Sequence, residues 1–166
     1  MSKQNGPNEE ISIIMNKIKF IKNHKDATAP RRAHISDSGY DIVSAADAEI
    51  ERDASGHILY LSYNSGISIE PPDNVYFLLY PRSSVRKYNL LLCNSVGVID
   101  TSYRGDVLVC FRPTIYTENI DDLNIYKKGD RIAQLIPRIR LDIDFVESSY
   151  VRATKRGCGG FGSSGE

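Results

Sequence analysis

The chain has 166 residues, enough to bury a hydrophobic core without disulfides or metals, and its 41% hydrophobic and 25% charged residues are typical of a soluble globular protein. Basic and acidic residues both number 21, so the net charge of zero gives no general attraction to nucleic acid, and an anionic ligand must be held by local groups. We expect no membrane partner, because the N-terminus carries no secretory signal and no apolar stretch approaches the roughly 18 residues that span a bilayer.

Short strands dominate the pattern along the chain. Residues 1–16 are polar and predict a flexible leader, although the apolar residues at 11–15 are also compatible with a strand extension or a brief helix. A single β-domain is expected over residues 17–150, where runs rich in Ile, Val, Leu, Tyr and Phe alternate with turn residues. Strands are predicted at 18–21, 58–62, 66–69, 75–80, 90–93, 107–111, 131–136 and 143–146, and one short helix at 83–87.

The fold class follows from these elements. No helical period of 3.6 is sustained over a dozen residues, and the strand spacing favours an all-β sandwich or barrel. The last segment, residues 151–166, is rich in glycine and predicts a mobile tail. A plain linker would not need Arg156 and Phe161 among its glycines.

Cysteines and histidines give little sign of a metal site. Cys93, Cys110 and Cys158 form no C-x-x-C pair, which argues against a disulfide framework or a zinc site and for a reducing compartment. The three histidines show no ligand spacing. We therefore expect a soluble intracellular protein, cytoplasmic or, in a eukaryotic host, nuclear.

The segment at 94–106, NSVGVIDTSYRGD, carries the strongest functional signal. Two extended runs flank residues that break strands, so the pattern predicts a β-hairpin. Its tip holds an acid, Asp100, an aromatic, Tyr103, and Gly105. Most turn aspartates are only solvated or bonded to their own backbone, but an acid and a phenol beside exposed amides also suit a small-molecule site.

Four further stretches place polar groups where strands end. SGYD supplies Asp41, PRSS supplies Arg82 with two hydroxyls, and GDRIAQ supplies the neutral donor and acceptor Gln134. The tail supplies Arg156 with glycine amides and serines. Guanidinium, hydroxyl and backbone N–H groups of this kind suit phosphate oxygens, although for each stretch alone a surface ion pair, a helix cap or a turn is the more common role.

Together and in this order, SGYD, PRSS, NSVGVIDTSYRGD, GDRIAQ and RGCGGFGSSG resemble the five motifs of the trimeric deoxyuridine triphosphatases, the dUTPases. The resemblance implies an all-β, jelly-roll-like β-clip subunit in a homotrimer, with active sites shared between subunits. The implied reaction is the magnesium-dependent hydrolysis of dUTP to dUMP and pyrophosphate, which limits uracil incorporation into DNA and supplies dUMP for dTTP synthesis.

The resemblance also implies roles for individual residues. Asp100 would activate the water that attacks the α-phosphate, and Asp41 would reach Mg²⁺ through a water. Uracil would be held by backbone groups of the 94–108 region, with Tyr103 against the deoxyribose. Arg156 would pair with the γ-phosphate and Phe161 would stack on uracil. The implied substrate-binding set is Arg82, Ser83, Ser84, Asn94, Val98, Ile99, Tyr103, Leu108, Gln134, Arg156, Phe161 and Gly162.

The chain departs from the family pattern at three places: Ser84 stands where many members have glycine, Cys158 where serine is common, and the connection at 112–126 is longer and more polar than usual. The dCTP deaminases share the fold and the Arg-Ser-Ser motif, but the position of their catalytic glutamate is Cys110 here, which disfavours deamination. A third hypothesis is a binding or regulatory role, for which the leader and the 112–126 connection are the candidate surfaces.

Overall fold

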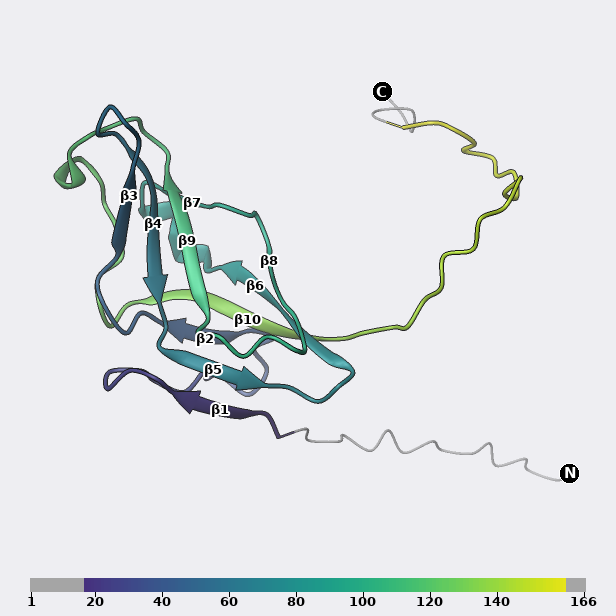
Figure 1. The fold of residues 1–166 in the computed structure, drawn as a ribbon, viewed down its shortest axis with the longest axis horizontal. Coiled ribbons are helices and arrows are strands. Elements are labelled where there is room, and N and C mark those ends of the chain that lie inside the picture. Colours follow the sequence, from purple (N-terminus) through teal and green to yellow (C-terminus); the bar gives the residue numbers. More distant parts are fainter. Residues whose placement is uncertain (1–16, 161–166) are drawn as a thin grey trace, which may run out of the picture.

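The computed structural model describes residues 17–160, which form ten β-strands and two short 3-10 helices (Figure 1). The predicted leader and the predicted site residues Phe161 and Gly162 lie outside the described residues. The strands are β1 (Lys19–Lys22), β2 (Tyr40–Val43), β3 (Glu49–Arg52), β4 (Ile58–Asn64), β5 (Ile67–Glu70), β6 (Val75–Pro81), β7 (Leu90–Leu92), β8 (Gly97–Ile99), β9 (Leu108–Pro113) and β10 (Arg131–Ile139). The helices are η1 (Ser83–Lys87) and η2 (Ile120–Asp122).

All strand pairs are antiparallel and form three sheets, with the orders β1-β5, β2-β10-β6-β8 and β3-β4-β9-β7. In Figure 1, β3, β4 and β9 run side by side and across the direction of β2 and β10. The predicted all-β class is therefore confirmed. Neither helix in residues 17–160 is long or apolar enough to cross a bilayer.

The core lies between the two four-stranded sheets. Alternate residues of β4 and β9 point into it, and Leu61, Tyr63, Val109 and Phe111 are fully buried. Each such side chain stabilises the fold by about 1.5–3 kcal/mol relative to exposure. Across the core, β6 and β10 contribute a second apolar layer: Val75, Phe77, Leu79, Ile132, Ala133 and Leu135.

Local patterns located most elements but missed three, and the first of them is β2, for which no range was predicted. The helix predicted at 83–87 is η1, with the same bounds. The strand β3 was missed because all four of its residues are exposed and carry no apolar alternation. The helix η2 was also missed, and its start is marked by Asn119, whose side chain accepts from the backbone N–H of Asp121.

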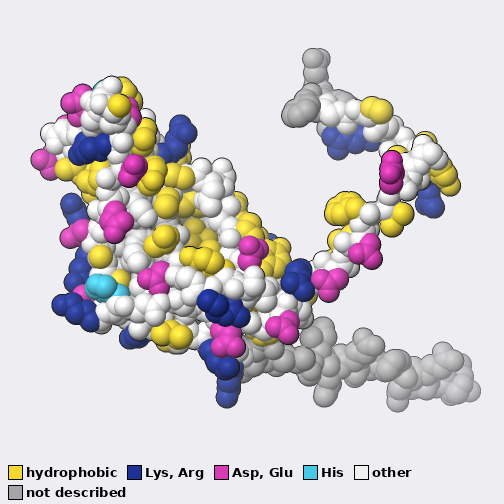
Figure 2. Space-filling model, viewed as in Figure 1, with side chains coloured by type: hydrophobic (Ala, Val, Ile, Leu, Met, Phe, Trp, Pro, Cys, Tyr) yellow, Lys and Arg dark blue, Asp and Glu magenta, His cyan; other side chains and the backbone are white. Residues whose placement is uncertain are grey.

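After β10 the chain leaves the body, and residues 140–151, here called the arm, run away from it (Figure 1). The strand predicted at 143–146 is wrong for a single chain: the arm has the alternating strand pattern, but no edge strand lies beside it within residues 17–160. Its apolar side chains are 68–98% exposed, and Figure 2 shows them along the arm. They are Leu141, Ile143, Phe145, Val146, Tyr150 and Val151.

Candidate active site

The segment predicted to be a hairpin passes instead from one sheet to the other, and residues 94–108 are called the crossing segment below. Its first run, β8, pairs with β6, whereas its second run leads into β9, which pairs with β4 and β7. The predicted pairing of the two runs with each other is therefore wrong. The tight turn before β8 places Ser95 at a φ of 59°, and a Cβ on Gly97 would lie 3.1 Å from Leu79 Cβ, so glycine lets β8 lie close to β6.

Tyr103 is held by its own loop. Its hydroxyl donates to the carbonyl oxygen of Asp106 at 3.0 Å, and its ring covers Gly105, where a Cβ would lie only 2.6 Å from the ring carbon Cζ. Only glycine fits at this position with the ring in place. The ring itself is 42% exposed and open to a ligand.

Asp106 ties the crossing segment to the rest of the body. Its carboxylate accepts hydrogen bonds from Asn23 at 2.5 Å, from Asn64 at 3.0 Å and from Ser68 at 3.4 Å. The hydrogen bond from Asn23 lowers the pKa of Asp106 most, those from Asn64 and Ser68 lower it further, and desolvation opposes them. Because these donors come from three parts of the chain, the loop that presents Tyr103 has a rigid base.

The other predicted polar groups gather at a second place, in a hollow of about 280 Å³. Asp41, Arg82, Ser83 and Gln134 all line it, together with Arg131. The two arginines clasp Asp41: Arg82 Nε lies 2.7 Å from Oδ1 and Arg131 Nη1 lies 3.0 Å from Oδ2. Asp37 also lines the hollow, so its two arginines and two carboxylates balance in charge, and an anionic ligand would be held by guanidinium N–H groups.

Sheet register explains why these residues meet. Gln134 of β10 pairs with Asp41 of β2 on one side and with Tyr80 of β6 on the other, and its amide donates to the Pro81 carbonyl at 3.1 Å. Gly39 precedes β2, and a Cβ there would overlap the Gln134 side chain. Arg131 was missed by the sequence reasoning, although it stands three residues before Gln134 in the same GDRIAQ stretch.

Asp100 lies far from this hollow along β6. Ile99 pairs with Phe77, so Asp100 falls beside Tyr76 near the start of β6, whereas Arg82 follows its end. The six residues from Tyr76 to Arg82 span about 20 Å, at about 3.3 Å per residue. A single triphosphate cannot touch Asp100 and Arg82 of the same chain.

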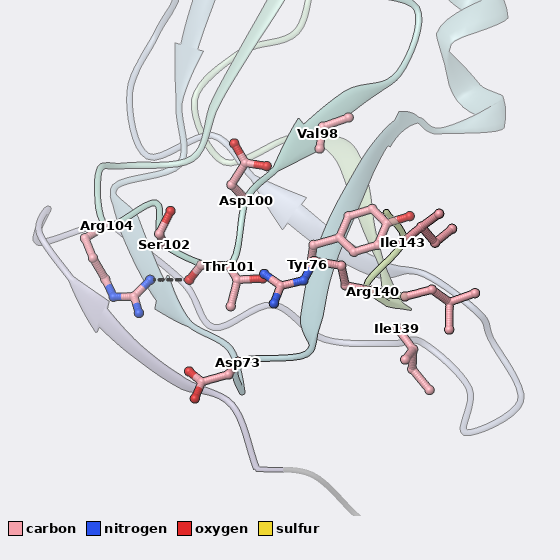
Figure 3. A pocket seen from close by; sticks show the side chains of 11 residues that line it. Asp73, Tyr76, Val98, Asp100, Thr101, Ser102, Arg104, Ile139, Arg140 and Ile143 are labelled. Carbon is pink, nitrogen blue, oxygen red and sulfur yellow. Dashed lines mark hydrogen bonds between the residues drawn. The ribbon is translucent and has the colours of Figure 1, made fainter. Parts of the chain in front are cut away.

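Asp100 lines a different hollow, of about 830 Å³, between the crossing segment, β6 and the base of the arm (Figure 3). Within residues 17–160 its carboxylate makes no hydrogen bond or ion pair. The loop around it is fixed by neighbours: Thr101 donates to the Val75 carbonyl at 2.8 Å, and Arg104 donates to the Thr101 carbonyl at 2.7 Å.

The remaining predicted site residues are distributed as follows. Val98 and Leu108 expose their side chains on the crossing segment, and Asn94 lies in its first turn, whereas Ile99 is half-buried against the core. Ser84 does not line the 280 Å³ hollow but lies beside Arg82 on η1. Arg156 lies beyond the arm, where its Nε donates to the Gly159 carbonyl at 2.8 Å.

Sequence comparisons find close similarity to one family. The dUTPase family model matches residues 25–165. A deoxyuridine 5'-triphosphate nucleotidohydrolase of Rhodococcus erythropolis is 38% identical over 142 residues, covering 84% of this chain and 80% of the relative. A protein of the same description from Corynebacterium glutamicum is 36% identical over 153 residues, covering 90% of this chain and 95% of the relative.

Solved structures with the same fold are also found. The dUTPase of Staphylococcus bacteriophage 80alpha, solved with dUPNHPP, superposes with a TM-score of 0.71 at 25% identity, covering 91% of this chain and 99% of that chain. A mutant dUTPase from phage phi11 of S. aureus, described with a coordinated structural Mg(II) ion, gives a TM-score of 0.67 at 19% identity, covering 83% and 100%. At 19% identity, the similarity to the phage phi11 enzyme shows a shared fold only.

Proposed function

The chain belongs to the dUTPase family and hydrolyses dUTP to dUMP and pyrophosphate, and we propose that two of its surfaces, contributed by different chains, form each active site. One surface is the hollow that Asp41, Arg82, Ser83 and Gln134 line, and the other is the crossing segment with Asp100. The observation that supports this most is the separation of about 20 Å along β6 between Asp100 and Arg82 of one chain.

The hollow would bind the triphosphate. Arg82 and the exposed Ser83 offer donors to phosphate oxygens, and Gln134 orients them from β10. Because Arg82 and Arg131 share the single carboxylate of Asp41, an incoming phosphate can take over part of their hydrogen bonding.

The residues of the hollow suit a Mg²⁺ ion that is held mainly by the phosphates of the substrate. No group of three or more His, Cys, Asp or Glu side chains within residues 17–160 is arranged to hold a metal. Mg²⁺ retains several waters and is commonly held by substrate phosphates with one or two carboxylates, so Asp41, acting through a water, is a sufficient protein ligand. Bound in this way, Mg²⁺ neutralises phosphate charge.

The crossing segment would select the nucleoside. Backbone groups near Asn94, Val98 and Leu108 would pair with the uracil edge, and cytosine, which inverts two positions of that edge, would leave buried groups unpaired, a mismatch that costs about 10⁴ in specificity. Tyr103 would occupy the space that a ribose 2′-OH needs. Asp100 is the base proposed for the water that attacks the α-phosphate.

Assembly as a homotrimer would bring the two surfaces together. The arm supports an oligomer, because its exposed apolar residues have the alternation of a strand and no strand of the described residues lies beside it. In the assembled site the tail would add Arg156 at the γ-phosphate, with Phe161 and Gly162 against the uracil. The exposed free thiols of Cys93 and Cys158 fit an intracellular, reducing location.

Deamination of dCTP is the rival reaction on this fold. The position of the deaminase glutamate is occupied by Cys110, whose thiol lies 3.6 Å from the Ser62 hydroxyl. Asp106, four residues earlier in the chain, accepts three hydrogen bonds that lower its pKa, which makes it a weaker base. Hydrolysis at the α-phosphate is therefore favoured.

A nucleotide panel tests the function. With Mg²⁺, pyrophosphate release from dUTP should exceed that from dCTP, dTTP and UTP by at least about 10²-fold, and chelation of the metal by EDTA should abolish it. Ammonia released from dCTP would establish a deaminase instead. No turnover of any nucleotide would favour the binding or regulatory role.

A further inference from the structure

Arg131 reaches the phosphate hollow because the strand β10 is irregular at its start. Between Arg131 and Ala133 the register of β10 against β2 shifts, so that two steps along β10 correspond to one step along β2, which is a β-bulge. The two residues after Arg131, Ile132 and Ala133, are consequently both buried. In a regular strand, residues three apart lie on opposite faces, whereas here Arg131 and Gln134 line the same hollow.

The carboxylate of Asp41 is divided between two arginines. Arg82 Nε lies 2.7 Å from Oδ1 and Arg131 Nη1 lies 3.0 Å from Oδ2, so each arginine binds one oxygen. The side chain of Asp41 is only 15% exposed. The other acid of the hollow, Asp37, accepts from a backbone N–H and forms no ion pair with either arginine among the described residues. Asp41 is therefore the carboxylate that the two arginines share.

The contact between Arg82 and Asp41 is less complete than such a pair allows. A guanidinium and a carboxylate commonly bind through two parallel hydrogen bonds, each to a different oxygen. Arg82 uses only Nε on Asp41, its Nη1 donates to the Ser84 hydroxyl at 3.3 Å, and its Nη2 has no partner within residues 17–160. The oxygen that a second hydrogen bond from Arg82 would need already binds Arg131.

We propose that Arg131 is a positioning residue for dUTP hydrolysis, which binds Oδ2 of Asp41, prevents Arg82 from closing on both oxygens, and so keeps the Nη groups of Arg82 available to the triphosphate. The inference rests on the proposed function of the hollow. It gives Arg131 a role through Asp41 rather than a contact with the substrate, and it gives the bulge of β10 a function. Because the side chain of Arg131 is 49% exposed, its replacement leaves no cavity in the core.

The variant Arg131→Gln removes the cation and keeps a polar side chain. Arg82 would then bind both oxygens of Asp41 most of the time, and dUTP would bind only the fraction of the protein in which Arg82 is free. We expect this fraction to be about a tenth, so KM for dUTP should rise about tenfold while kcat stays near the wild-type value, because the bound state is unchanged. Pyrophosphate release gives both constants. A lower kcat and a lower thermal unfolding midpoint with unchanged KM would show a merely structural role and overturn the inference.

Two single substitutions control this test. Arg131→Lys retains a cation that can make the one contact with Oδ2, so it should restore most of the affinity for dUTP, and a KM as high as that of Arg131→Gln would contradict the inference. Arg138→Gln is the matched control, because Arg138 is exposed on the same strand and makes no hydrogen bond or ion pair within residues 17–160. Its KM should equal that of the wild type, and an equal rise would point to the general charge of β10 instead.

A double variant separates action through Asp41 from direct contact with the substrate. Asp41→Asn removes the charge that would draw Arg82 away, so Arg131→Gln should weaken binding no further in that background. Because Asp41 is also the proposed contact of Mg²⁺, this comparison uses the dissociation constant of a non-hydrolysable dUTP analogue, measured by calorimetric titration. An equal additional loss would show that Arg131 itself binds the triphosphate, against the inference. A wild-type KM in Arg131→Gln would refute this inference alone, whereas no turnover by the wild type would refute the proposed function.

Discussion

Replacement of Asp100 by asparagine is expected to lower kcat for dUTP by a factor of about 10² to 10⁴, the usual contribution of a general base. The carboxylate is exposed on a fixed loop and unpaired within the described residues, so the isosteric amide should leave the fold unchanged. Affinity for a non-hydrolysable dUTP analogue should be retained. Pyrophosphate release gives kcat, and calorimetric titration gives the dissociation constant.

Asp73→Asn is the matched control for this variant, because Asp73 lines the same hollow as Asp100 but has no proposed role in the reaction (Figure 3). Its kcat should equal that of the wild type. A normal rate in Asp100→Asn would show that another group activates the water. Equal losses in both variants would point to the charge of the hollow rather than to a base.

Truncation after Thr154 is expected to reduce kcat/KM for dUTP by about 10²-fold or more while the oligomer persists. The deletion removes Arg156, whose guanidinium would stabilise charge on the leaving pyrophosphate through its contact with the γ-phosphate, together with Phe161 and Gly162. The described part of the deleted segment is exposed and makes only local hydrogen bonds, such as that from the Gly157 N–H to the Thr154 hydroxyl, so the body should remain folded.

Steady-state kinetics and light scattering of the truncated protein test this expectation, with removal of Gly165 and Glu166 alone as the control for shortening the chain. Unchanged kcat/KM after truncation would show that the tail takes no part in the reaction. A loss of the oligomer would mean that the tail acts in assembly instead.

Local sequence signals predicted elements better than their partners. The bounds of η1 follow from the proline and serines around Arg82, and the apolar alternation of β4 and β6 is clear in the sequence. The runs on either side of Asp100 were correctly read as extended, but their pairing was wrong, because alternation reports a buried face and not the neighbouring strand. The arm shows the same limit: its pattern is that of a strand, but residues 17–160 contain no strand that pairs with it.

The site could be predicted only in part for a related reason. The grouping of Asp41, Arg82 and Gln134 depends on the register of β2, β6 and β10, which no local spacing encodes, and was anticipated only through the family motifs. Arg131 and the Asp106 network were missed, because their importance comes from partners distant in sequence. The separation of Asp100 from Arg82 along β6 likewise emerged only from the strand pairing.

The central claim, that each active site takes Asp100 from one chain and Arg82 from another, is tested most directly by mixing two inactive variants. Asp100→Asn and Arg82→Ala chains are unfolded together in equal amounts and refolded into mixed oligomers. If the residues come from different chains, half of the sites receive an intact Asp100 and half of those an intact Arg82, so about a quarter of the wild-type activity should return. If both came from the same chain, no mixed site would hold both, and the activity would stay at the level of the separate variants.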